Sequence, residues 1–227
     1  MQLWVGLGNP GGTYAGNRHN IGFMALDRLA QDHGFGPWRS KFQGHISEGV
    51  LGGQKVLLLK PETFMNRSGQ AVGEAMRFYK LTPADVTVFH DELDVAPGKL
   101  RVKQGGGHAG HNGLRSLHAH VGEAYGRVRM GIGHPGHKDK VAGYVLADFA
   151  KGDQDWLDDV LRGVSDGAMA LAKGDSAGFM NAVALRVSPQ RSSTGTAAPD
   201  SKAEAAPKPD PAPDTRNAMQ KLMDRFR

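Results

Sequence analysis

Residues 2–12 read QLWVGLGNPGG, and this stretch decides which kind of fold the rest of the chain completes. Its first half, Gln2 to Leu7, is a short apolar run that ends at glycine, which is typical of a buried strand. The glycines match G-x-G-x-x-G, which in dinucleotide-binding folds begins a helix whose N-terminus meets a pyrophosphate. Here Pro10 and two glycines continue the loop, helical periodicity begins only near His19, and the acidic Asp27 falls within that helix. We therefore interpret the stretch as a strand followed by a tight turn.

Strand and helix patterns alternate along residues 1–187. Short apolar runs predict further strands, and Gly52-Gly53 between two of them is typical of a hairpin. Apolar residues at helical spacing predict helices. The predicted strands span 45–50, 55–59, 86–89, 100–102 and 128–132, and the predicted helices span 21–30, 72–79, 156–173 and 176–187. Hairpins combined with strand–helix units indicate an α/β domain with a mixed sheet.

The composition bounds the class of protein. A chain of 227 residues suits one domain, and the absence of cysteine excludes disulfides, zinc thiolates and cysteine nucleophiles. The N-terminus has no signal-peptide pattern, and no stretch approaches the roughly 18 apolar residues of a membrane helix. We therefore expect a cytoplasmic protein without a membrane partner. The net charge of +5 and the isoelectric point near 9.5 weakly favour a polyanionic partner.

The composition changes after Val187. Half of the twelve prolines fall between Pro189 and Pro213, among Ala, Ser, Thr and Lys. Such a segment buries too little apolar surface to offset its ordering entropy, so residues 188–216 are predicted to be a disordered linker. Residues 217–227 are predicted to be a short basic amphipathic helix. Its apolar positions are Met219, Leu222, Met223 and Phe226, and its cations are Lys221, Arg225 and Arg227.

Five polar residues stand where predicted strands end or predicted helices begin. Asn9, Asn66 and Asp91 each follow a strand, whereas His19 and Asn112 each stand at the start of a helix. The carboxyl ends of parallel strands meet at one edge of a sheet, so parallel strands would bring all five together. One imidazole, one carboxylate and three amides suit a histidine that activates water, with the carboxylate orienting the imidazole and the amides holding a carbonyl substrate.

Each of these residues also has a structural interpretation. A lone histidine such as His19 is more often structural or solvated than catalytic. Asn66 or Ser68 could cap the next helix, and Asp91 could belong to an exposed acidic turn. The glycine-rich stretch 105–113 could be a flexible loop without a role, although it leads into apolar residues at helical spacing.

Six strings of this sequence, taken together, closely resemble the bacterial-type peptidyl-tRNA hydrolase family in its usual order and spacing. They are VGLGNPG, RHNIG, KPETFMNRSG, FHDELD, GGGHAGHNGLRS and RMGIGHPG. The resemblance implies a catalytic domain over residues 1–187, with a mixed, twisted sheet flanked by helices. It implies hydrolysis of the ester between the peptide and the 3′-terminal ribose of peptidyl-tRNA by a cytoplasmic monomer that needs no cofactor or metal. The segment from Ser188 onward matches no motif of the family.

The same resemblance implies roles for individual residues. His19 would be the general base, Asp91 would keep it in the form that accepts a proton, and Asn9 would help to distinguish blocked from free aminoacyl-tRNA. As a neutral amide, Asn9 could pair with the N–H and C=O of a blocked substrate. Tyr14, Phe64, Met65, Asn66 and Asn112 would line the tRNA and peptide site, and Arg101, Lys103 and Arg129 would face the tRNA phosphates.

Two other classes of function compete with this hypothesis. A non-catalytic RNA-binding module would fit the isoelectric point, but RNA readers use aromatic stacking platforms and only 7% of the residues are aromatic. A metal-dependent hydrolase is suggested by the ten histidines. Their pairs, His108/His111 and His118/His120, lack a recognisable ligand spacing with an acidic partner.

Overall fold

The computed structural model describes residues 1–187 and is built on a seven-stranded sheet. The strands are β1 Gln2–Gly6, β2 Arg39–Lys41, β3 Gly44–Leu51, β4 Gln54–Pro61, β5 Val86–Glu92, β6 Leu100–Gln104 and β7 Gly126–Gly131. Their order is β2-β3-β4-β1-β5-β7-β6. The central strands β4, β1, β5 and β7 are parallel, whereas β2/β3, β3/β4 and β6/β7 pair antiparallel. The expected α/β fold with a mixed sheet is confirmed.

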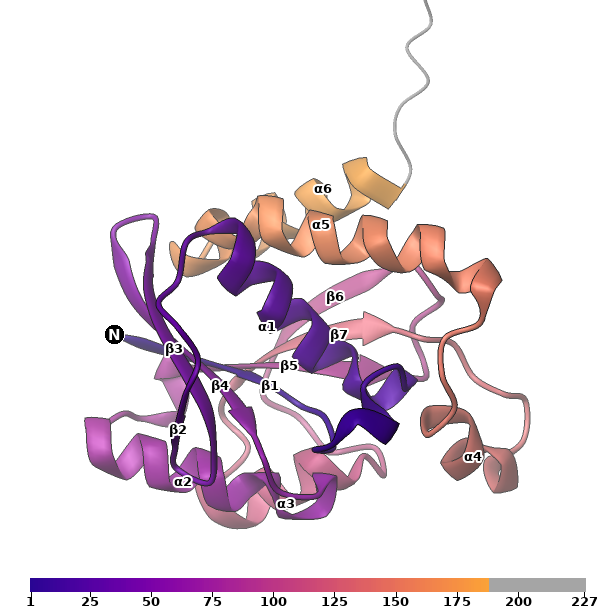
Figure 1. The fold of residues 1–227 in the computed structure, drawn as a ribbon, viewed down its shortest axis with the longest axis horizontal. Helices are drawn as coiled ribbons and strands as arrows, with labels where there is room; N and C mark the ends of the chain where they lie inside the picture. The colour runs from indigo at the N-terminus through magenta and orange to yellow at the C-terminus, as the bar shows by residue number, and fades with distance from the viewer. Residues whose placement is uncertain (188–227) are drawn as a thin grey trace, which may run out of the picture. The chain divides into compact units, whose positions relative to one another are not determined.

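Helices cover both faces of this sheet. The α-helices are α1 Ile21–Asp32, α2 Ser68–Tyr79, α3 Asn112–Val121, α4 Val141–Val145, α5 Gln154–Ala172 and α6 Ser176–Val187. Two 3₁₀ turns, η2 Arg18–Asn20 and η3 Met65–Arg67, lead directly into α1 and α2. Helices α1, α5 and α6 lie on one side of the sheet, and α2 and α3 lie on the other (Figure 1).

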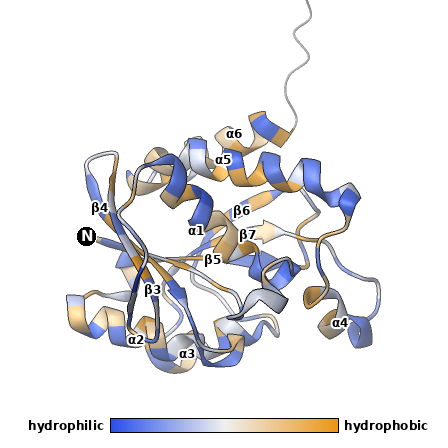
Figure 2. Cartoon of the chain, in the orientation of Figure 1, coloured by the Kyte–Doolittle hydropathy of each residue, from blue (hydrophilic) through white to orange (hydrophobic). Residues whose placement is uncertain are grey.

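The two faces of the sheet bury two separate apolar clusters. Along β1 the side chains alternate: Trp4 packs with α1 and α5, whereas Leu3 and Val5 pack with α2 and α3. All three are fully buried. Strand β1 is therefore apolar on both faces, as parallel strands between two helical layers are, and β5 beside it is coloured largely as hydrophobic in Figure 2.

Most predicted elements are present with ends shifted by a few residues. Gly52 and Gly53 form the turn between β3 and β4 with φ values of 56° and 84°, which confirms the hairpin. The sequence did not predict β2 or α4, because three exposed edge residues and a five-residue helix are too short to show a periodicity. The linker expected at 188–216 and the helix expected at 217–227 lie outside the described residues.

No helix within residues 1–187 is long and apolar enough to cross a membrane.

Candidate active site

His19 and Asp91 form the centre of the site. His19 belongs to η2, where the loop after β1 turns into α1, and Asp91 lies near the carboxyl end of β5. The His19 Nδ1 atom is 2.9 Å from each carboxylate oxygen of Asp91. Both residues are buried, with 7% of His19 and 3% of Asp91 exposed, so neither the solvated histidine nor the exposed acidic turn describes them. Asp91 also stands inside the strand, which runs three residues further than its apolar stretch predicted.

The pair is electrostatically coupled. Burial acts to lower the pKa of His19, but the charge of Asp91 and its hydrogen bond outweigh burial and raise this pKa above its usual value. Burial would raise the pKa of Asp91, yet the charges of His19 and His111 and the hydrogen bonds from both hold it well below its usual range. Asp91 is therefore an anion at neutral pH, and it keeps the proton of His19 on Nδ1.

A second imidazole, which the sequence analysis did not include in the site, reaches the same carboxylate. His111 Nε2 is 2.9 Å from Asp91 Oδ1, and its ring centroid lies 4.8 Å from that of His19. The other nitrogen, Nδ1, accepts from the backbone N–H groups of Gly113 and Leu114, at 3.1 and 3.4 Å. Because Nδ1 faces two donors, Nε2 must carry the proton and donate to Asp91. His111 is thus the N-cap of α3 and a donor to Asp91 at once.

His19, Asp91 and His111 are also the side chains that could hold a metal ion, since one ligand atom from each lies within 4.8 Å of the others. A metal-bound histidine normally donates its second ring N–H to an acceptor. The second nitrogen of His111 instead faces two backbone donors, so a metal at Nε2 would require an imidazolate. The site therefore does not fit a metal ion.

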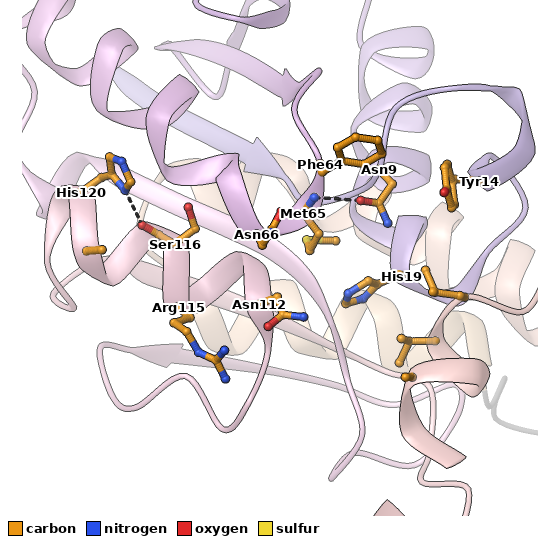
Figure 3. Close-up of a pocket in the computed structure, with 14 residues that line it drawn as sticks. Asn9, Tyr14, His19, Phe64, Met65, Asn66, Asn112, Arg115, Ser116 and His120 are labelled. Atoms are coloured by element: carbon orange, nitrogen blue, oxygen red, sulfur yellow. Dashed lines mark hydrogen bonds between the residues drawn. The ribbon is translucent and has the colours of Figure 1, made fainter. Parts of the chain in front are cut away.

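Asn9 is held in one orientation by its neighbours. Its Oδ1 accepts from the backbone N–H of Met65 at 2.8 Å, and its main chain exchanges two hydrogen bonds of 2.9 Å with the side chain of Asn20. The Asn9 side-chain NH₂ is left to point into the cleft beside His19 (Figure 3). Since Oδ1 is already engaged, the group that Asn9 presents is a donor, rather than both halves of an amide.

The residues expected at the substrate site do come together, in a cleft of about 720 Å³. It is lined by Asn9, Tyr14, His19, Phe64, Met65, Asn66 and Asn112, and continues along α3 past Arg115 to His120 (Figure 3). Asn66 does not cap α2: the N-cap residue is Arg67, which makes no side-chain cap, and the N–H of Gly69 donates to Ser116 Oγ at 3.0 Å. The hydroxyl of Ser68 donates to the Met65 carbonyl at 2.9 Å instead, so the capping interpretation of either residue is wrong. Phe64 is 58% exposed and stands at the rim as a free apolar surface.

A second cavity of about 580 Å³ lies on the other side of His19 and contains two of the three expected phosphate contacts. Lys103 and Arg129 line it, whereas Arg101 lines neither cavity. Arg101 pairs with Arg129 across β6 and β7, so both project from the same face of the sheet. Arg129 also forms an ion pair with Glu92 at 2.9 Å, which compensates part of its charge.

The structure adds Arg127, which the sequence analysis passed over. Arg127 is 4% exposed, and its guanidinium donates to the carbonyl oxygens of Gly106 and Gly107 and contacts His118 Nε2 at 3.0 Å. It thereby holds the glycine-rich loop that leads to His111. The alternation of Arg127 and Arg129 along one strand was the available signal, because it places both on the face opposite the buried Val128 and Met130.

Known proteins resemble this chain along most of its length. The family model for peptidyl-tRNA hydrolase matches residues 3–192. The chain is 74% identical over 227 residues to the peptidyl-tRNA hydrolase of Cereibacter sphaeroides strain KD131 and 68% identical over 239 positions to that of Ruegeria pomeroyi, with 100% of each chain covered. The crystal structure of peptidyl-tRNA hydrolase from Acinetobacter baumannii superposes with a TM-score of 0.76 at 42% identity, covering 81% of this chain and 94% of that one. The chain therefore belongs to the peptidyl-tRNA hydrolase family.

Proposed function

We propose that His19 is the general base with which this chain carries out the reaction of its family. That reaction is the hydrolysis of peptidyl-tRNA, in which water cuts the ester and releases tRNA and peptide. The observation that carries the proposal is the 2.9 Å bond from His19 Nδ1 to Asp91. It commits one ring nitrogen to the carboxylate and leaves the lone pair of Nε2 available in the cleft.

The proposed chemistry needs no covalent enzyme intermediate. Nε2 of His19 takes a proton from water while the water oxygen attacks the ester carbonyl carbon. The imidazolium formed in this step is stabilised by the buried Asp91 anion, as in other histidine–carboxylate pairs. When the tetrahedral intermediate collapses, the proton passes from Nε2 to the 3′ oxygen of the departing ribose. His19 is then neutral again and ready for another turnover.

The amides of the cleft are proposed to bind the peptide end of the substrate. Asn9 offers a fixed donor next to His19, which suits the carbonyl oxygen of a blocked amino group. A free aminoacyl-tRNA has an amine there, largely or partly charged near neutral pH, and lacks that carbonyl. The donor of Asn9 would be left unpaired, and such a loss supports selectivity. Asn66 and Asn112 line the same cleft and are proposed to hold the peptide backbone or the developing oxyanion.

The tRNA phosphates are proposed to lie over the second cavity, against Lys103 and Arg129, with Arg101 further along the same face. Affinity for tRNA should then fall with salt, with a log–log slope of roughly −0.7 to −0.9 per phosphate contact. Replacing Lys103 by Gln should make the slope shallower by about one contact. A slope that is identical in the variant would place the RNA on another surface.

We further propose that the reaction proceeds without a metal ion, and the hydrogen bonds made by both nitrogens of His111 support this. From the family resemblance we also propose that the enzyme is cytoplasmic and monomeric, and that its catalytic domain spans residues 1–187. Activity in the presence of a chelator tests whether a metal ion is needed, and sedimentation of the purified protein tests whether it is a monomer. Removing residues 188–227 should leave catalysis intact, whereas loss of folded protein would contradict the proposed boundary.

The decisive experiment is an assay of released tRNA. Purified protein is incubated with N-blocked aminoacyl-tRNA in the presence of a chelator, beside a His19→Ala control. Turnover by the wild type and its loss in the control would support the proposal. Binding without turnover would favour an RNA-binding module, and turnover abolished by the chelator would favour a metal-dependent hydrolase.

A further inference from the structure

The side chain next to His19 in the sequence reaches a different part of the chain. Arg18 lies in the same 3₁₀ turn, but its guanidinium extends to the segment between α4 and α5. Nη1 donates to the carbonyl oxygens of Ala147 and Asp148 at 3.3 and 2.8 Å, and Nη2 forms an ion pair with Asp153 at 3.0 Å. Only 12% of the Arg18 side chain is exposed.

Two aromatic rings complete the environment of this guanidinium. Its central carbon lies 4.5 Å from the ring centroid of Tyr144 and 5.5 Å from that of Phe149. Tyr144 belongs to α4, and its hydroxyl donates to the Ile132 carbonyl at 2.5 Å. Arg18 therefore contacts α4 itself as well as the chain that follows it, and a cation over an aromatic face adds to the attraction.

The backbone next to Arg18 is joined to the same segment. The N–H of Arg18 donates to the Ala147 carbonyl at 3.1 Å, and the N–H of Phe149 donates to the Gly16 carbonyl at 3.0 Å. The side-chain amide of Asn17 donates to Asp148 Oδ1 at 2.7 Å. Residues 16–18 and 147–149 thus form one connected unit, although about 130 positions separate them in the sequence.

The segment held in this way forms a wall of the site. Ala142 and Val145 line both cavities, and Leu146 lines the substrate cleft. All three lie in or directly after α4, which has five residues and is too short to be stable on its own. Its position must therefore come from its contacts, and those of Arg18 are the charged ones among them.

We propose that Arg18 is a positioning residue that holds α4 against His19, so that the wall of the substrate cleft and the general base keep a fixed distance. This inference rests on the proposed function of the cleft. Arginine suits the task because its planar fork donates in several directions at once, whereas a lysine ammonium at the same position could not satisfy two carbonyls, a carboxylate and a ring. The effect is expected on substrate binding more than on the chemical step, because the bond between His19 and Asp91 does not involve Arg18.

The experiment compares Arg18→Lys with Asp153→Asn and a control, Arg28→Gln. Arg28 also bonds two aspartates, Asp32 and Asp158, but lines neither cavity. For Arg18→Lys we expect KM for N-blocked aminoacyl-tRNA to rise about tenfold, as for loss of a charged hydrogen bond, while kcat changes less than about threefold. Asp153→Asn keeps both carbonyl bonds and should raise KM less. The control should match the wild type.

Hydrogen exchange gives a readout that does not depend on catalysis. In Arg18→Lys the amide of Phe149, which donates to Gly16, should exchange faster than in the wild type, whereas amides within α5 should not change. A lower melting temperature with unaltered KM and unaltered exchange at Phe149 would overturn the inference and leave Arg18 as a structural residue. If the wild type itself fails to release tRNA, the proposed function fails, but the exchange measurement still decides whether Arg18 holds this segment.

Discussion

Two loops each bring an imidazole to Asp91, and they do so in opposite ways. The loop after β1 presents His19 through Nδ1, so that Nε2 remains open to the cleft. The glycine-rich loop before α3 presents His111 through Nε2, and its Nδ1 accepts from two amides at the start of α3. Among the described residues, His19 therefore has a hydrogen-bond partner on one ring nitrogen, whereas His111 has partners on both.

This difference fits the roles proposed for the two imidazoles, a general base and a fixed donor. We propose that His19 takes up the proton, because its Nε2 is open to the cleft. Both nitrogens of His111 are engaged, Nε2 with Asp91 and Nδ1 with the N–H groups of Gly113 and Leu114, so His111 acts as a fixed donor to Asp91. Because Asp91 accepts from both imidazoles, we expect His111 to limit how strongly the carboxylate raises the pKa of His19.

Removing the base should produce the largest effect. His19→Ala should lower kcat by the roughly 10²–10⁴-fold attributed to a positioned general base, with little change in the affinity for the tRNA product. On folded protein, kcat is measured at saturating N-blocked aminoacyl-tRNA, and the affinity for the tRNA product is measured by direct binding. A variant that keeps near-normal turnover would show that the two imidazoles do not differ as described.

Asp91→Asn should slow catalysis somewhat less and also move the pH profile. Without the anion, the main cause that raises the pKa of His19 is gone while burial remains, so this pKa should fall. The acidic limb of kcat/KM, which reports the free enzyme, should shift to lower pH. The rate on the plateau should nevertheless be reduced, because the amide can hold the wrong tautomer. An unmoved limb at normal rate would reduce Asp91 to a structural residue.

A substitution at Asn9 tests whether the side-chain NH₂ beside His19 selects the blocked substrate. Asn9→Ala should reduce turnover of the blocked substrate by about a hundredfold, as for loss of one positioned donor. Turnover of free aminoacyl-tRNA should change much less, so the ratio between the two substrates should narrow. Rates for both substrates are measured side by side on the wild type and the variant. If the ratio is unaltered, discrimination belongs to Asn66 or Asn112 instead.

Much of the fold and part of the candidate site could be predicted from the sequence, because they follow from local patterns of residues. Apolar runs and helical spacing predicted every strand of the sheet except β2, and most helices. The parallel strands β4, β1, β5 and β7 place Asn9, Asn66 and Asp91 around His19, at one edge of the sheet. The convergence itself rested on an assumption about strand direction, which local pattern does not contain.

The part that could not be predicted depends on contacts between distant residues. His111 was considered only as a metal ligand with His108, since nothing local shows that its ring faces Asp91. Asn66 satisfied the rule for a helix cap, yet the 3₁₀ turn before α2 places it in the cleft. Arg18 lies within a motif string, but its partners are about 130 residues away.

His111 offers the subtlest test of the comparison, because its two nitrogens can be replaced separately. An asparagine at 111 is a good N-cap, so it can still accept from α3, but it is too short to reach Asp91. A glutamine can place its NH₂ near the position of Nε2 and still donate to Asp91, but it caps the helix poorly. His111→Asn therefore removes the donation to Asp91 and keeps the cap, whereas His111→Gln keeps the donation and weakens the cap.

We expect His111→Asn to keep normal stability and to shift the acidic limb of kcat/KM to higher pH, the opposite direction from Asp91→Asn. The reason is that Asp91 would then interact with His19 alone and raise its pKa further. Below the shifted limb the rate should fall by up to about tenfold, as for one hydrogen bond to a charged group. His111→Gln should instead lose about 1 kcal/mol of stability through the weaker cap and keep the limb in place. Denaturant unfolding and a pH series on both variants separate the two effects. Should the shift of the limb follow the loss of stability in both variants, His111 would be a helix cap and nothing more.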